Sequence, residues 1–333
     1  MSMTSHRYRN AMPTSPPTPD EPGSVMQCME VWGGNEPVNR DVVMPGLDAW
    51  VYCEPFENAS RGGDVYFVSS CATGRITRLL VADVSGHGTE VAETAIALRS
   101  LMRRFVNQLD QSHFIQAMNH EFISLSKDGR FATAIAATYF SPTSTLTLTN
   151  AGHPPAMLYR ADVKQWFFLQ KQDHGDRGPA NVPLGILDIT DYDQRSMHLQ
   201  PGDMVLCYTD SLIECRDKHG SFLDKEGLAK ILNQLNVTSP KSLIPDLLKV
   251  LGDLDPNNLT EDDVTLLLFT PNERRPNQSF SRRMLIPFRM MITLAKSFLP
   301  GGEPMPWPDL NLANIGGAMF SPFNRLWGRN IRD

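Results

Sequence analysis

The sequence lacks the features of a secreted, membrane-spanning or disulfide-stabilised protein. No stretch of about 20 apolar residues is present to span a bilayer, and the N-terminus has no apolar signal-peptide core. The five cysteines form no CxxC pair, so neither a zinc ribbon nor a disulfide framework is indicated. The formal net charge of -6 argues against a nucleic-acid-binding surface. We therefore expect a cytoplasmic protein with no nucleic-acid partner.

Composition divides the chain into three parts. Residues 1–40 are rich in Pro, Ser, Thr and Asn and are predicted to form a flexible N-terminal arm. Residues 41–271 carry a dense apolar pattern and are predicted to form the folded domain. Residues 272–333 form a basic and apolar C-terminal tail. Three interpretations of the tail stay open: docking on its own domain, an amphipathic element for a membrane surface or a partner, and disorder.

The apolar pattern alternates between strand-like and helix-like segments. Strands are predicted at about 47–55, 64–71, 76–84, 131–140, 144–152, 155–160, 165–170, 195–200, 203–210 and 263–270. Helical stripes are formed by Val91, Ala95, Leu98, Met102 and Phe105, and by Ile115, Met118, Phe122 and Leu125; two more helices are predicted at about 224–235 and 240–251. Hairpin strands with helices inserted in pairs predict an α+β fold, with sheets packed on each other and helices outside.

An acid stands at the end of the apolar run "LLVADV", where Asp83 is followed by Gly86-His87-Gly88. If Thr73 and Gly74 are the centre of a hairpin turn, Asp64 lies directly opposite Asp83 on the same face of the sheet. Directly opposed side chains have Cβ atoms about 5 Å apart, so two ionised carboxylates would repel each other there. Either one of them is protonated or a cation lies between them.

Further acids stand at the rims of other buried strands. Asp210 ends the run "MVLCYTD", and Asp262 and Asp263 precede "VTLLLFT". Oxygen ligands without a Cys or His cluster favour Mg²⁺ or Mn²⁺. The glycine-rich bend would let the main chain, including the Val84 carbonyl, approach such an ion. For any one acid, a solvated strand end is the simpler interpretation, but the group together predicts a metal site.

Seven short motifs then carry a family resemblance. They are "RGGDVY", "ADVSGHG", "FATA", "NAGHPPAMLY", "VPLGI", "YTDSLIE" and "EDDVTLLLF", in that order. Together they resemble the bacterial PPM-type (protein phosphatase 2C-like) serine/threonine phosphatases of the sporulation-E and sigma-B-regulator branch. Two positions depart from the family pattern: Ser211 replaces a common glycine, and Arg61 replaces a small apolar residue.

The resemblance implies a four-layer α-β-β-α sandwich with two central antiparallel sheets and flanking helix pairs. It also implies two Mn²⁺ or Mg²⁺ ions, held by Asp64, Asp83, the Val84 carbonyl, Asp210 and Asp262, without deciding between Asp262 and Asp263. A hydroxide bridging the two ions would attack the phosphorus of phosphoserine or phosphothreonine in line.

Three further residues are candidates for the reaction. His87 and His153 are candidate proton donors, and Arg61 is a candidate ligand for a phosphate oxygen. The alternatives are a helix cap for His87, a packed turn residue for His153 and a solvated loop cation for Arg61.

The resemblance further implies a phosphorylated protein substrate such as an anti-sigma-factor antagonist. A catalytically weak or inactive phosphatase-fold binding module in a signalling complex is the alternative. A dinucleotide-binding loop is disfavoured, because "SGHGTEV" has Val91 where the G-x-G-x-x-G/A pattern requires a small residue. A membrane-anchored scaffold acting through the tail is a further alternative.

Overall fold

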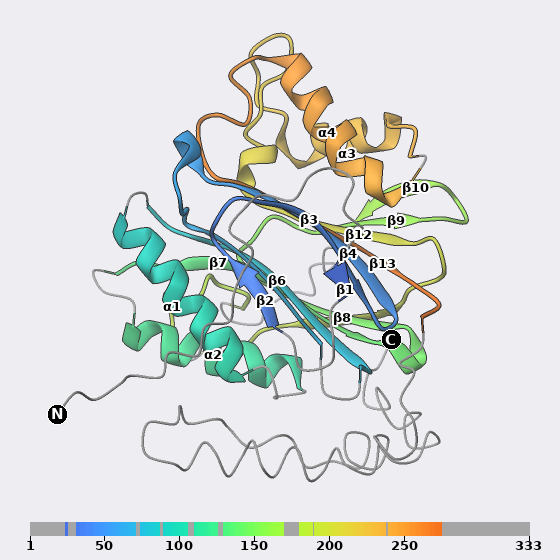
Figure 1. The fold of residues 1–333 in the computed structure, drawn as a ribbon. Helices are drawn as coiled ribbons and strands as arrows, with labels where there is room; N and C mark the ends of the chain where they lie inside the picture. The colour runs from blue at the N-terminus through green and yellow to red at the C-terminus, as the bar shows by residue number, and fades with distance from the viewer. Residues whose placement is uncertain are drawn as a thin grey trace, which may run out of the picture.

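The computed structural model describes residues 24–25, 31–70, 74–86, 89–105, 110–125, 129–169, 180–188, 190–237 and 239–274. Two β-sheets are stacked at the centre, and a pair of helices covers the outer face of each (Figure 1). This arrangement confirms the predicted α+β sandwich. Within the described ranges, no helix is both long and apolar enough to cross a bilayer.

The first sheet has seven strands. Its order is β1 (Ser24–Val25), β3 (Val38–Met44), β4 (Leu47–Glu54), β13 (Val264–Pro271), β12 (Met204–Tyr208), β9 (Met157–Arg160) and β10 (Gln165–Phe168). Every neighbouring pair is antiparallel except the short β1, which runs parallel to β3. The sheet therefore joins N-terminal strands to the last strand of the domain.

The second sheet has six strands, all antiparallel to their neighbours. Its order is β11 (Gln194–His198), β8 (Thr145–Ala151), β7 (Ala132–Phe140), β6 (Ile76–Val84), β5 (Asp64–Ser70) and β2 (Val31–Gly34). The strands β5, β6 and β7 are buried along almost their whole length because both faces of the sheet are covered.

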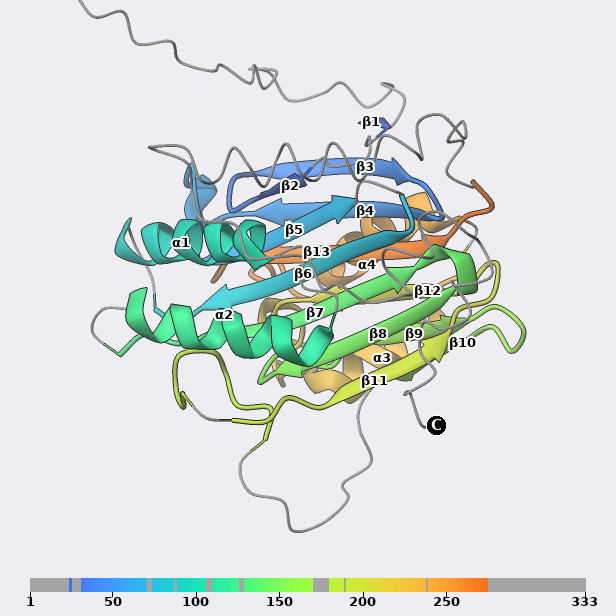
Figure 2. The ribbon, with the colours of Figure 1, turned by 90° about the horizontal axis from the view of Figure 1, so that it is seen from below.

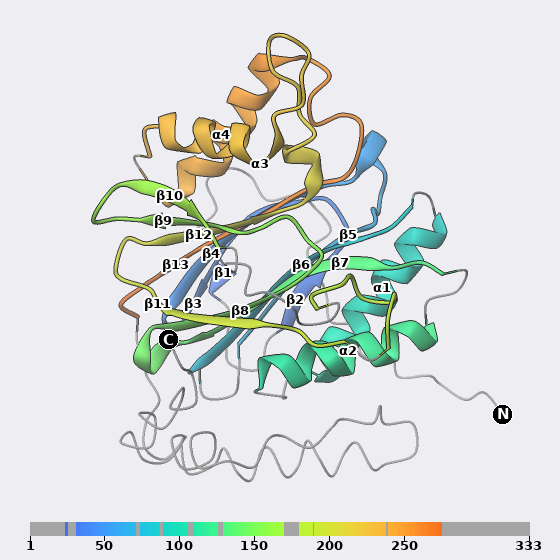
Figure 3. The same ribbon diagram turned by 180° about the vertical axis from the view of Figure 1, so that it is seen from behind.

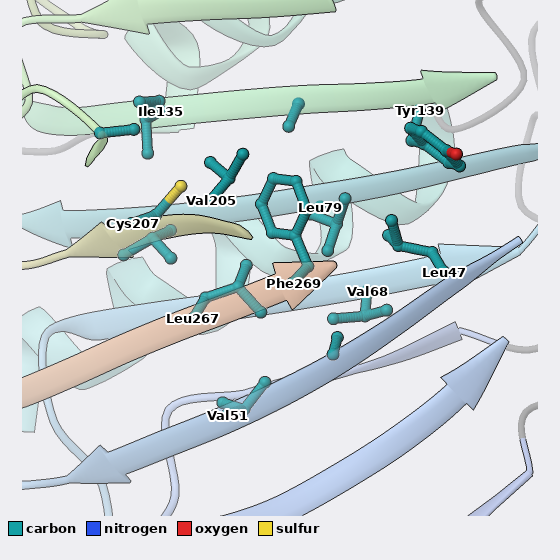
Figure 4. Packing of buried hydrophobic residues seen from close by; sticks show 14 of the residues in the cluster. Leu47, Val51, Val68, Leu79, Ile135, Tyr139, Val205, Cys207, Leu267 and Phe269 are labelled. Carbon is teal, nitrogen blue, oxygen red and sulfur yellow. The ribbon is translucent and has the colours of Figure 1, made fainter. Parts of the chain in front are cut away.

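Side chains from the inner faces of both sheets form the central core (Figure 4). In β4 the buried residues alternate with partly exposed ones, so that Leu47 and Val51 point inward. They share this core with Leu79 of β6 and with Phe269 of β13, which has no exposed surface. Burial of such side chains contributes about 1.5–3 kcal/mol each, which binds the two sheets together.

The helices α1 (Thr89–Phe105) and α2 (Gln111–Leu125) cover the second sheet (Figure 2). The predicted stripe from Val91 to Phe105 packs against that sheet in a second core. Helices α3 (Asp224–Gln234) and α4 (Pro240–Leu254) cover the first sheet and form a third core (Figure 3). Three cores between four layers account for the apolar content of the domain.

Two details of the sequence prediction are wrong. The strand β2 and the beginning of β3 lie within residues 1–40, which were assigned to a flexible arm. These strands pair with β5 and β4, so distant partners supply a stability that local composition does not reveal. Leu125, assigned to the buried stripe of α2, is 47% exposed because it is the last residue of that helix. The short strand β1 also lies within the predicted arm, whereas residues 1–23 and 26–30 and the tail from residue 275 onward lie outside the described residues.

Candidate functional site

The site lies between the two sheets at one end of the sandwich, where β5 begins and β6 ends. Asp64 and Asp83 are directly opposed in the β5–β6 ladder, as the hairpin count predicts. Both face the other sheet, because Tyr66 and Val81, the next residues on that face, belong to the central core. Asp64 is only 2% exposed. Two carboxyl groups whose Cβ atoms are about 5 Å apart therefore share this end of the ladder.

The environment of Asp83 favours its protonated form. Burial, together with the nearby carboxylates of Asp210, Asp262, Asp263 and Glu214, raises the pKa of Asp83 to about 7. Acids that stand at the ends of different strands in the sequence therefore lie close enough together to raise the pKa of the single carboxyl of Asp83. Glu214 was not singled out by sequence reasoning, although the motif "YTDSLIE" contains it.

Asp64 is connected to the opposite sheet through Thr209. The Thr209 hydroxyl donates a hydrogen bond of 2.9 Å to Asp64 Oδ2 and accepts one of 3.0 Å from the Thr265 amide. Burial and the charges of Asp83 and Asp263 raise the pKa of Asp64, while the two threonines oppose that rise. Asp210 follows Thr209 at the start of a short 3-10 helix, Asp210–Leu212, and burial raises the pKa of its carboxyl too.

Asp263 accepts hydrogen bonds from the loop that leads into Asp64 and holds that loop in place. Its Oδ1 accepts a hydrogen bond of 2.7 Å from the Phe56 amide, and its Oδ2 accepts bonds of 2.5 Å and 3.2 Å from the amides of Gly63 and Asp64. A Cβ atom on Gly62 would lie 2.3 Å from Asp263 Oδ2, so glycine is required for this approach. The neighbouring Asp262 is exposed, and its Oδ1 accepts a bond of 2.7 Å from the Asp263 amide.

Asn35 anchors the same loop from the far edge of the second sheet. Its side-chain amide donates bonds of 2.8 Å to the Gly62 carbonyl and 3.3 Å to the Ala92 carbonyl. The Gly62 amide donates in return to the Asn35 carbonyl at 2.9 Å. Sequence reasoning missed Asn35 because it lies in the predicted arm, and a polar residue with distant partners leaves no local signal.

The main chain of β6 approaches the glycine loop closely. A Cβ atom on Gly63 would lie 3.2 Å from the Val84 carbonyl oxygen and 2.8 Å from Val91. Gly86 has a φ of 105°, a left-handed conformation that favours glycine. The Val84 carbonyl thus lies next to the loop that leads into Asp64, where the sequence predicts a main-chain ligand.

The structure places the candidate catalytic residues in different environments, and one of them is not described. His87 lies outside the described residues. The side chain of Arg61 is half exposed and forms an ion pair with Glu36 at 3.2 Å. His153 is buried, with its Nδ1 hydrogen-bonded to Thr133 Oγ1 at 2.8 Å, and burial lowers the pKa of its imidazole to about 3.

The acids form a loose group rather than a preformed metal cage. Among the residues that the structure describes, no three His, Cys, Asp or Glu side chains converge in a geometry that would hold an ion. The donors are nevertheless all oxygen atoms, and Asp64 and Asp83 both have raised pKa values that a nearby cation would lower. The donor set therefore fits Mg²⁺ or Mn²⁺, with rearrangement of side chains on binding.

Comparisons with known proteins agree on one family. Residues 73–272 match the family model described as Stage II sporulation protein E (SpoIIE). The chain is 25% identical over 191 residues to phosphoserine phosphatase RsbU from Bacillus subtilis, covering 57% of this chain and 54% of that protein. The chain thus spans about half the length of this curated relative.

Two solved structures share the fold. The RsbU and RsbW domains of a Mycobacterium tuberculosis protein match with a TM-score of 0.59 at 22% identity, over 86% of this chain and 75% of that one. RsbX in complex with magnesium matches with a TM-score of 0.52 at 17% identity, over 71% of this chain and 100% of that one. At these identities the likeness concerns the fold.

Proposed function

Because this chain belongs to the SpoIIE family, we propose that it is a metal-dependent protein serine/threonine phosphatase. The match over residues 73–272 confirms the resemblance predicted from the seven motifs. The observation that carries the proposal is the group of buried and partly buried carboxylates at one end of the sandwich, where Asp83 has a pKa of about 7. A fold gains no stability from such an arrangement unless a cation offsets the repulsion.

The proposed ligands are the carboxylates of Asp64, Asp83, Asp210 and Asp262 and the carbonyl oxygen of Val84. Two Mg²⁺ or Mn²⁺ ions are proposed, and the structurally similar RsbX was solved with magnesium. When bound, such ions lower the pKa of a water ligand and offset charge on a phosphoryl group. The chain itself fixes the acids by strand register and excludes water from Asp64 by packing the sheets together.

Asp262 is proposed as the ligand in preference to Asp263. Both oxygens of Asp263 already accept hydrogen bonds from main-chain amides of the loop that leads into Asp64. Asp262 is exposed at the same rim, and its charge raises the pKa of Asp83, so it lies close enough to act on that group. Asp263 would then position Asp64 by holding the loop, while Asp262 contributes oxygen atoms.

Arg61 and His87 remain proposals for the phosphoryl transfer itself. Arg61 would bind a phosphate oxygen by exchanging its exposed partner Glu36 for the substrate, which costs little because exposed ion pairs are weak. His87 would donate a proton to the leaving oxygen. His153 is less suited to that role, because burial keeps its imidazole neutral at physiological pH.

The proposed substrate is a protein that carries phosphoserine or phosphothreonine. Similarity to a phosphoserine phosphatase supports this class. An anti-sigma-factor antagonist is the specific substrate that we propose. Contact of the C-terminal tail with a membrane surface or a partner is a separate proposal, tested by liposome co-sedimentation of the full chain against a chain that ends at Thr270.

The test is Mn²⁺-dependent hydrolysis of p-nitrophenyl phosphate and of a phosphoserine peptide, with and without EDTA. Replacement of one ligand removes several kcal/mol of transition-state stabilisation, so Asp83→Asn and Asp210→Asn should each lower kcat/KM about 100-fold or more. Asp253→Asn, an exposed acid of α4, is the matched control and should retain activity. Full activity in EDTA, or in either ligand variant, would refute the proposal; binding of a phosphoprotein without turnover would indicate a binding module.

A further inference from the structure

His153 is a buried side chain that the proposed reaction does not use. It follows β8 in a turn that Asn150 closes from both sides. The His153 amide donates to Asn150 Oδ1 at 2.8 Å, and Asn150 Nδ2 donates to the His153 carbonyl at 2.8 Å. Only 6% of the residue is exposed. The main chain that carries the imidazole is thus held by its own turn, independently of any contact of the ring with the site.

The imidazole of His153 contacts Thr133, which is the cross-strand neighbour of Asp83. His153 Nδ1 and Thr133 Oγ1 are 2.8 Å apart. Thr133 is directly opposite Asp83 in the β6–β7 ladder, just as Asp64 is opposite Asp83 in the β5–β6 ladder. A row of three side chains, Asp64, Asp83 and Thr133, therefore crosses the inner face of the sheet at adjacent positions.

His153 also faces the other sheet. The main chain of Tyr208, the last residue of β12, lies close enough to the imidazole to raise its pKa, which partly opposes the lowering caused by burial. Two residues further along the chain is Asp210. The imidazole thus lies between β7, which pairs with β6 at Asp83, and β12, which ends two residues before Asp210. A second contact between the two sheets, the hydrogen bond from Thr209 to Asp64, is found at the same end of the sandwich.

A protonated imidazole would be the simplest means of offsetting so many carboxylates. Burial instead lowers the pKa of His153 to about 3, so the ring is neutral at physiological pH and offsets none of their charge. In a neutral ring one nitrogen donates and the other accepts, which suits hydrogen bonds that hold geometry.

We propose that His153 is a positioning residue that acts through Thr133 to fix Asp83 relative to Asp210 across the two sheets, and so sets the affinity of the site for divalent ions. The inference rests on the proposed function, since it concerns the same site. Hydrogen-bonded groups that orient metal ligands typically affect metal affinity or activity by about 10-fold to 100-fold. Loss of the Thr133–His153 contact should fall in this range.

The experiment measures the dissociation constant for Mn²⁺ alone by isothermal titration, with melting temperature in EDTA, kcat and KM recorded on the same preparations. Thr133→Val removes the hydroxyl with little change of shape, and His153→Ala removes the ring. The control is Thr138→Val in the same strand, where Thr138 Oγ1 donates to Gln111 Oε1 at 2.6 Å and is buried away from the acids.

We expect Thr133→Val and His153→Ala to weaken Mn²⁺ binding about tenfold. Thr138→Val should lower the melting temperature and leave Mn²⁺ affinity unchanged. His153→Asn, which retains a hydrogen-bonding atom near the position of Nδ1, should recover part of the affinity. If His153→Ala does not fold, Thr133→Val alone decides the matter.

Two results would overturn the inference. The first is unchanged Mn²⁺ affinity in folded Thr133→Val protein. The second is unchanged affinity in His153→Ala with a lower kcat and the loss of the basic limb of the pH profile, which would make His153 a proton donor. Failure of the wild-type protein to bind Mn²⁺ or to hydrolyse a phosphoester would instead refute the proposed function, so the two failures are distinguishable.

Discussion

Replacement of Asp83 by asparagine should stabilise the metal-free protein, even though it should abolish activity. In the unfolded chain the Asp83 carboxyl has an ordinary pKa of 3.8, and in the folded protein that pKa is about 7 because of burial and nearby carboxylates. The folded state therefore binds this proton more tightly, and ionisation of Asp83 at neutral pH opposes folding. Asparagine keeps the shape and removes the charge.

The magnitude follows from linkage between proton binding and folding. A difference of about three pH units in pKa corresponds to about 4 kcal/mol of unfolding free energy. Below about pH 3 the carboxyl is protonated in both states, and at about pH 4 the penalty is still under 1 kcal/mol; it grows up to about pH 7 and is complete above that. For a domain of this size, 4 kcal/mol corresponds to a rise in melting temperature of about 10 °C.

The assay is thermal and urea unfolding in EDTA at pH 8 and at pH 4, with Asp253→Asn as the control for loss of an exposed acid. Asp83→Asn should melt well above the wild type at pH 8 and close to it at pH 4. Saturating Mn²⁺ should reverse the order at pH 8, because only the wild type gains the full free energy of metal binding. An Asp83→Asn protein that melts at or below the wild type at pH 8 in EDTA would refute the reasoning about repulsion.

Two further predictions concern the loop beside the acids. Gly62→Ala places a Cβ atom 2.3 Å from Asp263 Oδ2, so it should lower the unfolding free energy by about 1–3 kcal/mol and reduce activity, whereas Gly252→Ala, with no atom within 4 Å, should be neutral or stabilising in urea unfolding. A stable and active Gly62→Ala protein would contradict the close packing of this loop. Asp262→Asn should weaken Mn²⁺ binding without loss of metal-free stability, while Asp263→Asn should lower that stability by about 1–3 kcal/mol, since Asp263 accepts three main-chain hydrogen bonds. The reverse pattern in titration calorimetry and urea unfolding would make Asp263 the ligand.

The sequence determined those parts of the site that depend on local order. Asp64 and Asp83 are separated by a single hairpin, so counting residues outward from the turn was enough to place them opposite each other. The helical stripe from Val91 to Phe105 and the apolar runs of the strands predicted the layers, because burial imposes a period on nearby residues. The order of the seven motifs predicted the family, which the match over residues 73–272 confirms.

Tertiary structure decided the contacts between residues far apart in the chain. The hydrogen bond from Thr209 to Asp64 joins residues 145 positions apart, and Asp263 holds a loop 200 positions before it. Asn35, assigned by composition to a flexible arm, is buried against that loop. No local pattern predicts such partners, because the energy that selects them comes from sheets meeting face to face. The sequence thus determined which acids stand at strand ends, and only the packing of the two sheets decided which of them meet and which are already engaged as hydrogen-bond acceptors.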